Sequence, residues 1–291
     1  MAVDPLLPDP RNNDILVHVG GRLVPRDEAK VSVFDSSVQG GDAVWEGLRV
    51  YEGRVFRLAA HLARLQDSAK AMAFAEVPSS ADIERAVLET LQANGMYDGA
   101  HVRLTLTRGK KVTSGMSPKF NRYGCTLIVL AEWKAPVYGQ GGLTLVTSSV
   151  RRNGPSSIDS KIHHNNLINN ILAKIEANNA GVEEAIMLNA EGFVAECTGD
   201  NIFIVKENKL LTPPLSAGAL EGITQNSVST IAADLGFEVV VDNIARSDLY
   251  IAEEAFVCGT AAEVSSVNSV DDRKIPCPGP MTSAIAEVYH E

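Results

Sequence analysis

The sequence has few cysteines, and none lie at the spacing used by redox or zinc sites. Among 291 residues there are four Cys, and no two of them form a C-x-x-C pair. They are scattered along the chain as Cys125, Cys197, Cys258 and Cys277. This scarcity excludes a disulfide-stapled fold and favours a reducing compartment, so we expect a cytoplasmic protein.

Long apolar runs and excess positive charge are also lacking. No stretch is long enough to span a bilayer, and the N-terminal residues lack the basic and apolar regions of a signal peptide. With 26 basic and 36 acidic residues, the formal net charge is −10. That balance disfavours nucleic acid and anionic membranes as partners. The net charge does not exclude a small anionic ligand, because backbone N–H groups and one or two Arg beside the ligand outweigh the electric field of the whole protein.

Sequence signatures of nucleotide and metal sites are missing. There is no P-loop and no Rossmann glycine fingerprint, and no helix start follows the glycine-rich stretch 139–142. His163 and His164 are adjacent, so they cannot converge on one ion from a helix or a strand. We therefore expect no bound metal.

The first half of the chain reads as mixed helix and strand. Hydrophobic periodicity and turn residues predict a hairpin around Gly20-Gly21 and two helices. The expected strands cover 14–19, 22–24, 31–34, 44–51, 101–107 and 124–131, and the expected helices cover 58–73 and 82–93. The segment 133–142 has the Pro and Gly content of a linker. We place an interdomain loop there, after a small α+β domain over 1–132.

The second half, 143–291, is predicted to be a larger, β-rich, cofactor-binding domain. A helix over about 163–178 carries Ile168, Ile171, Leu172 and Ile175 on one side, which we assign to the core. The strands at 184–189, 193–198 and 201–206 are expected to form a meander. Further elements are expected at 143–150, 223–235, 237–242, 255–259 and 279–289. The fold class is therefore α+β with two domains.

The segment from Glu196 to Thr224 carries the most chemical information. Glu196 is predicted on a strand, and Gly222-Ile223-Thr224 opens a helix. A helix N-terminus with free N–H groups and a hydroxyl suits a phosphate, and a nearby carboxylate can hold a protonated ring nitrogen. With an upstream amine, Lys161, these are the groups that pyridoxal 5'-phosphate requires.

Seven blocks in order make the chain resemble the fold-type IV pyridoxal-phosphate enzymes, the class IV aminotransferases. That family includes branched-chain and D-amino-acid aminotransferases and aminodeoxychorismate lyase. The resemblance covers roughly residues 15–290. Its blocks are Phe34-Asp35, Gly41 to Arg49, His61 to Leu65, Lys161, Glu196 to Phe203 and Gly222 to Thr224, followed by Cys258 to Glu263.

The resemblance implies the cofactor contacts. Lys161 would form the Schiff base, and because amine attack needs a neutral amine, we expect desolvation or nearby positive charge around it. Glu196 would pair with the pyridine nitrogen. The phosphate would be held by Arg64, Ile223, Thr224 and Thr260. Asn166 stands where a family Tyr donates to the cofactor O3′, and a side-chain amide can donate the same bond.

The substrate contacts are implied less completely. The residues at substrate-facing family positions are Trp45, Arg103, Tyr138, Gly199 and Ala261. Gly40 replaces an expected pocket Tyr, and Trp45 replaces the usual Phe. A basic loop, Arg108 to Lys119, either traps a second carboxylate or is a solvated loop, and we favour the solvated loop.

The implied activity is transamination between a branched-chain L-amino acid and a 2-oxo acid such as 2-oxoglutarate. A D-amino-acid aminotransferase and a lyase of the aminodeoxychorismate type remain alternatives, and a non-catalytic cofactor-binding protein is disfavoured by Lys161 and Glu196 together. The family builds its active site between two domains with residues from a second subunit. We therefore expect a homodimer or a higher homo-oligomer.

Overall fold

The protein divides into two compact units, each with its own sheet. The computed structural model describes residue 4 and residues 6–139 and 141–291. The first unit contains the described residues up to Ala135 together with Ile162–Asn166, and the second contains Pro136–Lys161 and Leu167–Glu291. The short stretch Ile162–Asn166 belongs to the first unit because it pairs with β3, through Trp45 N to His163 O and Asn165 N to Ala43 O, both 2.9 Å.

The first unit is built on an antiparallel sheet of six strands in the order β2-β1-β6-β5-β3-β4. The strands are β1 (Leu16–Val19), β2 (Arg22–Pro25), β3 (Ala43–Tyr51), β4 (Arg54–Val55), β5 (Ala100–Thr107) and β6 (Thr126–Trp133). The predicted hairpin at Gly20-Gly21 is confirmed as β1–β2. The long antiparallel register of β3 with β5 and of β5 with β6 makes these three strands the centre of the unit.

The strand predicted over 31–34 is wrong. The buried carboxylate of Asp35 accepts hydrogen bonds from Ser37 N and from the hydroxyls of Thr107 and Thr126, at 2.9–3.0 Å. The first of these bonds caps the short helix α1 (Ser36–Gly40). The chain therefore turns here instead of continuing as an extended strand.

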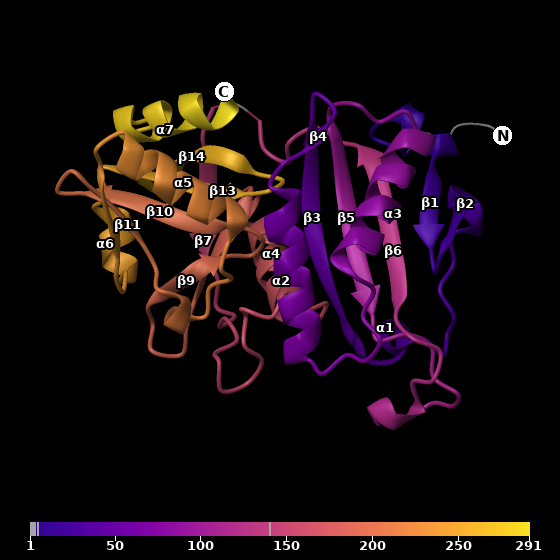
Figure 1. Ribbon diagram of the computed structural model, residues 1–291. Coiled ribbons are helices and arrows are strands. Elements are labelled where there is room, and N and C mark those ends of the chain that lie inside the picture. The colour runs from indigo at the N-terminus through magenta and orange to yellow at the C-terminus, as the bar shows by residue number, and fades with distance from the viewer. Residues whose placement is uncertain (1–3, 5, 140) are drawn as a thin grey trace. The chain divides into compact units, whose positions relative to one another are not determined.

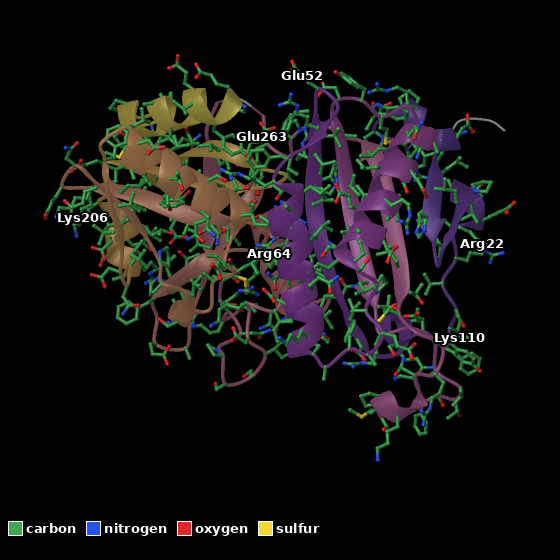
Figure 2. The ribbon with its side chains drawn as sticks, in the orientation of Figure 1. Arg22, Glu52, Arg64, Lys110, Lys206 and Glu263 are labelled. Carbon is green, nitrogen blue, oxygen red and sulfur yellow. The ribbon has the colours of Figure 1, made fainter. Side chains whose placement is uncertain are left out.

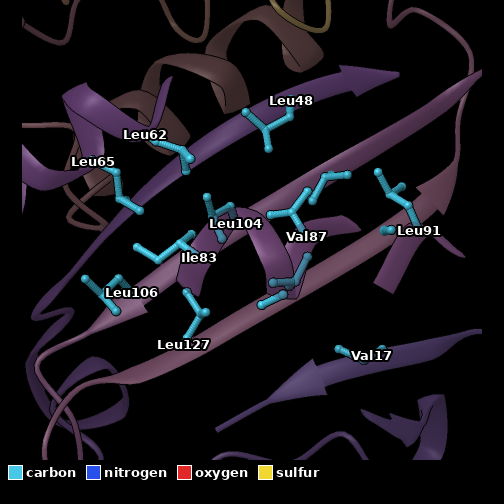
Figure 3. Close-up of a cluster of buried hydrophobic side chains, with 14 of the residues drawn as sticks. Val17, Leu48, Leu62, Leu65, Ile83, Val87, Leu91, Leu104, Leu106 and Leu127 are labelled. Carbon is cyan, nitrogen blue, oxygen red and sulfur yellow. The ribbon is translucent and has the colours of Figure 1, made fainter. Parts of the chain in front are cut away.

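Two helices, α2 (Leu58–Ala71) and α3 (Ser80–Ala93), cover one face of this sheet (Figure 1). The Ser79 hydroxyl caps α3 by accepting from Asp82 N. Figure 3 shows the core that the helices form with the strands. The labelled side chains are Val17, Leu48, Leu62, Leu65, Ile83, Val87, Leu91, Leu104, Leu106 and Leu127. Each large aliphatic side chain buried here contributes about 1.5–3 kcal/mol.

The second unit contains a mixed sheet in the order β12-β11-β10-β13-β14-β7-β8-β9, with β15 on β14. The strands are β7 (Leu143–Thr147), β8 (Glu184–Leu188), β9 (Val194–Cys197), β10 (Asn201–Lys206), β11 (Lys209–Thr212), β12 (Glu238–Val241), β13 (Glu254–Gly259), β14 (Glu263–Val270) and β15 (Arg273–Lys274). The predicted meander is only half right: β8 pairs with β9, but β10 pairs with β13. The loop 198–200 therefore connects β9, at one end of the strand order, to β10, the third strand from the other end.

Four helices accompany this sheet: α4 (Ile168–Ala180), α5 (Ile223–Asp234), α6 (Arg246–Tyr250) and α7 (Pro280–His290). Helices α5 and α7 lie side by side next to β13 and β14 (Figure 1). Their core includes Phe203 and Phe256, whose rings stack with centroids 5.1 Å apart. No helix in the described part of the chain is long and apolar enough to cross a membrane.

The core side assigned to the helix over 163–178 is wrong. Helix α4 begins at Ile168, and the four large residues assigned to the core are exposed, at 46–70%. Ala173 and Ala177 are buried instead, in a cluster with residues of β8. Small side chains let the helix approach the strand closely, and the larger residues therefore turn outward.

Candidate functional site

Glu196 lies on β9 and is buried, so its carboxylate does not face solvent. Arg152 Nη2 lies 2.6 Å from Oε1, and both partners are less than a tenth exposed. The other oxygen, Oε2, accepts from Asn201 Nδ2 at 3.2 Å and from Leu220 N at 2.9 Å. Arg152 and Asn201 had no assigned role from the sequence. A buried carboxylate requires hydrogen-bond donors or a cation. The expected burial of Glu196 was therefore the signal that such partners exist.

Asn201 links Glu196 to the start of α5. Its amide also donates to Leu220 O at 3.0 Å. A Cβ on Gly222 would lie only 1.9 Å from Asn201 Oδ1, so this contact requires glycine. The buried carboxylate and the helix N-terminus, predicted separately, are thus brought together through one amide.

The N-terminus of α5 presents a buried hydroxyl. Thr224 is 2% exposed, and its Oγ1 has no hydrogen-bond partner among the described residues. The first N–H groups of any helix lack intrahelical acceptors. Such an unsatisfied buried hydroxyl beside free N–H groups fits an anionic ligand such as a phosphate.

Lys161 is the last residue of the second unit before Ile162–Asn166. Its side chain is 51% exposed, and Nζ lies 3.9 Å from the Asp159 carboxylate. The expected desolvation around this amine is therefore not observed. The amine is accessible, as attack on an aldehyde requires.

Three predicted substrate-facing residues lie on segments that bond to each other in the second unit. Val137 N donates to Ala261 O at 2.9 Å, and Thr260 and Ala261 lie between β13 and β14. The adjacent Tyr138 hydroxyl lies 2.7 Å from Asp200 Oδ2, next to Gly199. Tyr138, Gly199 and Ala261 therefore belong to one hydrogen-bonded group of segments.

In the first unit Trp45 contacts Arg103 and His163. The Arg103 guanidinium lies 3.4 Å from the Trp45 ring centroid, and the His163 ring centroid lies 4.1 Å from it. Arg103 Nη2 also donates to Asn165 Oδ1 at 3.0 Å. Burial lowers the pKa of Arg103 to about 10, so it stays charged at neutral pH. The structure thus brings two predicted substrate residues, Trp45 and Arg103, into a cation–π contact.

Arg64, on α2 (Figure 2), pairs with the buried carboxylate of Glu46. His61 Nδ1 lies 2.7 Å from Oε2 and His163 Nδ1 lies 3.3 Å from Oε1 of the same group. Burial alone would raise the pKa of Glu46, but His163, Arg64 and His61 together hold it well below its usual range. Glu46 had no assigned role, although it is the one acid in the strand Ala43–Tyr51 and needs a cation if buried.

Asn166 and the basic loop bond mainly to their own surroundings. Asn166 Nδ2 donates to Gly41 O at 3.2 Å. Arg108 binds the Asp42 carboxylate at 2.6 and 3.1 Å, and Lys111 donates to Gly115 O. Lys110, labelled in Figure 2, lies over the Tyr123 ring. These contacts favour the interpretation that the loop has a structural role, rather than the interpretation that it binds a second carboxylate.

Comparison with known proteins gives one consistent result. Residues 43–270 match the family described as amino-transferase class IV. The chain is 55% identical over 288 residues to a branched-chain-amino-acid aminotransferase-like protein 2 of Arabidopsis thaliana, covering 98% of this chain and 51% of that protein. The chain spans about half the length of the two curated Arabidopsis relatives it matches.

Solved structures agree. The branched-chain aminotransferase of Thermoproteus uzoniensis with norvaline is similar with a TM-score of 0.89 and 37% identity, over 95% of this chain and 94% of that chain. The branched-chain amino acid aminotransferase of Thermobaculum terrenum, in its PLP form, is similar with a TM-score of 0.86 and 29% identity, over 96% of this chain and 94% of that chain.

Proposed function

Because the chain belongs to the class IV aminotransferases, we propose that it is a pyridoxal-phosphate-dependent aminotransferase. The donor is a branched-chain L-amino acid and the acceptor is a 2-oxo acid such as 2-oxoglutarate. The observation that carries this proposal is the Glu196–Asn201–α5 arrangement. It places a buried carboxylate beside a helix N-terminus whose Thr224 hydroxyl has no hydrogen-bond partner in the part of the chain that the structure describes.

The residues of the second unit suit pyridoxal 5'-phosphate. The phosphate would accept from the Thr224 hydroxyl and from the Ile223 and Thr224 N–H groups, while Glu196 would face the pyridine nitrogen. When bound, the cofactor supplies an electron-accepting ring next to the α-carbon of the substrate. Arg64, Thr260 and Asn166 stay predicted cofactor contacts.

Glu196 would keep a proton on the ring nitrogen of the bound cofactor, because a carboxylate stabilises that protonated form. Arg152 balances the carboxylate at Oε1. The pair therefore holds the carboxylate in one orientation. Lys161, with its accessible amine, is the group that takes the α-proton and returns it.

Trp45 is the proposed apolar contact for an aliphatic side chain. Its ring is held in place by Arg103 and His163. Tyr138, Gly199 and Ala261 remain the other proposed substrate contacts.

Steady-state kinetics on paired enantiomers tests the proposal, with 2-oxoglutarate and pyruvate as acceptors. We expect a higher kcat/KM for L-leucine than for D-alanine or D-glutamate. The reverse order would favour the D-amino-acid reaction.

The proposal includes a homodimer in the cytoplasm. The four Cys are free thiols, which agrees with a reducing compartment. Sedimentation velocity at micromolar concentration should give twice the mass of the chain. A fully active monomer would contradict the dimer.

A further inference from the structure

A single hydroxyl in the second unit faces two buried carboxyl groups. Tyr138 Oη lies 2.7 Å from Asp200 Oδ2 and 3.0 Å from Glu184 Oε2. Asp200 is 8% and Glu184 2% exposed. A phenol carries one hydrogen and can donate it to only one of the two. If both carboxyl groups were ionised, the phenol oxygen would face one of the carboxylates with no hydrogen between them. Two acceptors would then repel each other at hydrogen-bond distance.

The donors around each carboxyl group decide which one holds the extra proton. Glu184 Oε1 accepts from Ala185 N and the Thr198 hydroxyl, both at 2.6 Å, and Lys174 Nζ lies 3.2 Å from Oε2. Among the described residues, the only hydrogen-bond partner of the Asp200 side chain is Tyr138. Glu184 is therefore stabilised as the anion that accepts from Tyr138, and Asp200 is the acid that donates to the phenol oxygen.

We propose that Asp200 is a positioning residue that works as a neutral carboxylic acid. Its proton completes the chain Asp200 to Tyr138 to Glu184 and keeps a second negative charge out of the cluster. Ionisation of Asp200 removes that bond and adds one negative charge beside Gly199. This charge repels acceptors that carry a second carboxylate, such as 2-oxoglutarate. Aliphatic 2-oxo acids have no second carboxylate, so their binding is affected less.

The electrostatic surroundings agree with this geometry. Burial is the main cause that raises the pKa of Asp200 to about 7; the charges of Glu184 and Glu196 add to the rise, while Tyr138 and Lys174 oppose it. The thiols of Cys197 and Cys258 also lie in this region, and burial raises the pKa of each. The charge of Asp200 therefore changes within the neutral range.

The cluster connects segments that carry predicted substrate contacts. Tyr138 follows Val137, which bonds to Ala261, and Asp200 follows Gly199. A Cβ on Gly259 would lie 2.6 Å from Asp200 Oδ1, so the turn before Thr260 packs directly on this carboxyl group. The consequence for acceptor choice rests on the proposed function, whereas the protonation of Asp200 does not.

Carbon-13 NMR of protein labelled at the aspartate carboxyl carbon tests the protonation directly. The resonance that disappears in Asp200→Asn is assigned to Asp200. We expect it to shift from the protonated to the ionised position with a midpoint near pH 7. An Asp200 resonance that is ionised throughout the range from about pH 5 to about pH 8 would overturn the proposal, whatever reaction the protein catalyses.

Two matched amide variants separate the two carboxyl groups. Asn at 200 can donate a hydrogen bond to Tyr138, as the neutral acid does. Gln at 184, by contrast, removes the negative charge that Glu184 presents to its surrounding hydrogen-bond donors. We expect Asp200→Asn to keep the melting temperature at neutral pH and Glu184→Gln to lower it. In the unfolded chain Asp200 ionises near its ordinary value of 3.8. The native state thus holds an extra proton, and wild-type stability falls as pH rises from about 4 to about 7 relative to Asp200→Asn. Equal loss of stability in both variants would contradict the assignment.

Acceptor kinetics test the functional consequence. For the wild type, the KM for 2-oxoglutarate divided by the KM for 4-methyl-2-oxopentanoate should rise about threefold or more between about pH 6 and about pH 8.5. In Asp200→Asn the ratio should stay flat. A wild-type ratio that does not change, with the NMR midpoint as expected, would remove the role in acceptor choice. Absence of transamination with any acceptor would instead count against the proposed function.

Discussion

The carboxylate of Glu46 and the guanidinium of Arg64 form a two-point ion pair in the first unit. Arg64 Nε donates to Oε1 at 2.9 Å, and Nη2 donates to Oε2 at 2.6 Å. Glu46 is fully buried and the Arg64 side chain is 14% exposed. A buried acid on β3 thus sets the orientation of an Arg on α2 that is predicted to bind phosphate.

Glu46→Gln should destabilise the protein by about 3–5 kcal/mol, because it leaves the Arg64 charge without its buried partner. Urea unfolding measures the change. The control is Glu52→Gln, an exposed position in the turn after β3, which should stay within about 0.5 kcal/mol of wild type. Equal stability of Glu46→Gln and Glu52→Gln would mean that the pair does not stabilise the unit.

Lys161→Ala should abolish covalent attachment of the cofactor. In the wild type, borohydride should fix a pyridoxyl label on the Lys161 peptide, and mass spectrometry of the digest identifies it. Lys209→Ala is the matched control, since Lys209 has a similarly exposed side chain. A label on any other lysine would show that Lys161 is not the attachment site.

Glu196→Gln should lower kcat by at least about a hundredfold while cofactor affinity changes much less. The phosphate contacts supply most of the affinity, whereas the carboxylate controls the protonation of the ring. Cofactor titration and steady-state kinetics measure the two effects separately. Glu191→Gln, at an exposed turn position, should behave as wild type. Unchanged turnover in Glu196→Gln would remove its assigned role.

Stability should depend on His163 at mildly acidic pH. Burial lowers the pKa of His163 from 6.5 to about 4, against the opposing effect of Glu46. The unfolded chain therefore binds a proton that the native state excludes, and stability decreases as pH falls from about 6.5 to about 4. Urea unfolding across this range should show a smaller decrease for His163→Gln than for wild type. The exposed control His290→Gln should keep the wild-type slope, and an identical slope in both variants would argue against His163.

Local sequence patterns predicted most of the elements. Helix α3 and the hairpin at Gly20-Gly21 were found close to where the sequence predicted them, because helical periodicity and tight turns depend on nearby residues. The family blocks indicated Glu196 and Thr224, and both side chains are buried, while their cofactor contacts stay predictions. Pairing between distant strands was less predictable. Strand β10 was expected beside β9, but it lies beside β13, since the loop 198–200 redirects the chain.

The sequence by itself determined the fold class, the family and the identities of the candidate cofactor residues, because these follow from short motifs and their order. Only the tertiary structure decided which distant side chains meet. Glu46 contacts His163, 117 positions later, and Tyr138 contacts Asp200, 62 positions later. Neither pairing has a signal in the local sequence. Each pair forms because polar groups from separate segments become buried and then require a hydrogen-bond or charge partner. The same reason explains α4, where contact with β8 selected the small alanine face for burial and left the large apolar residues exposed.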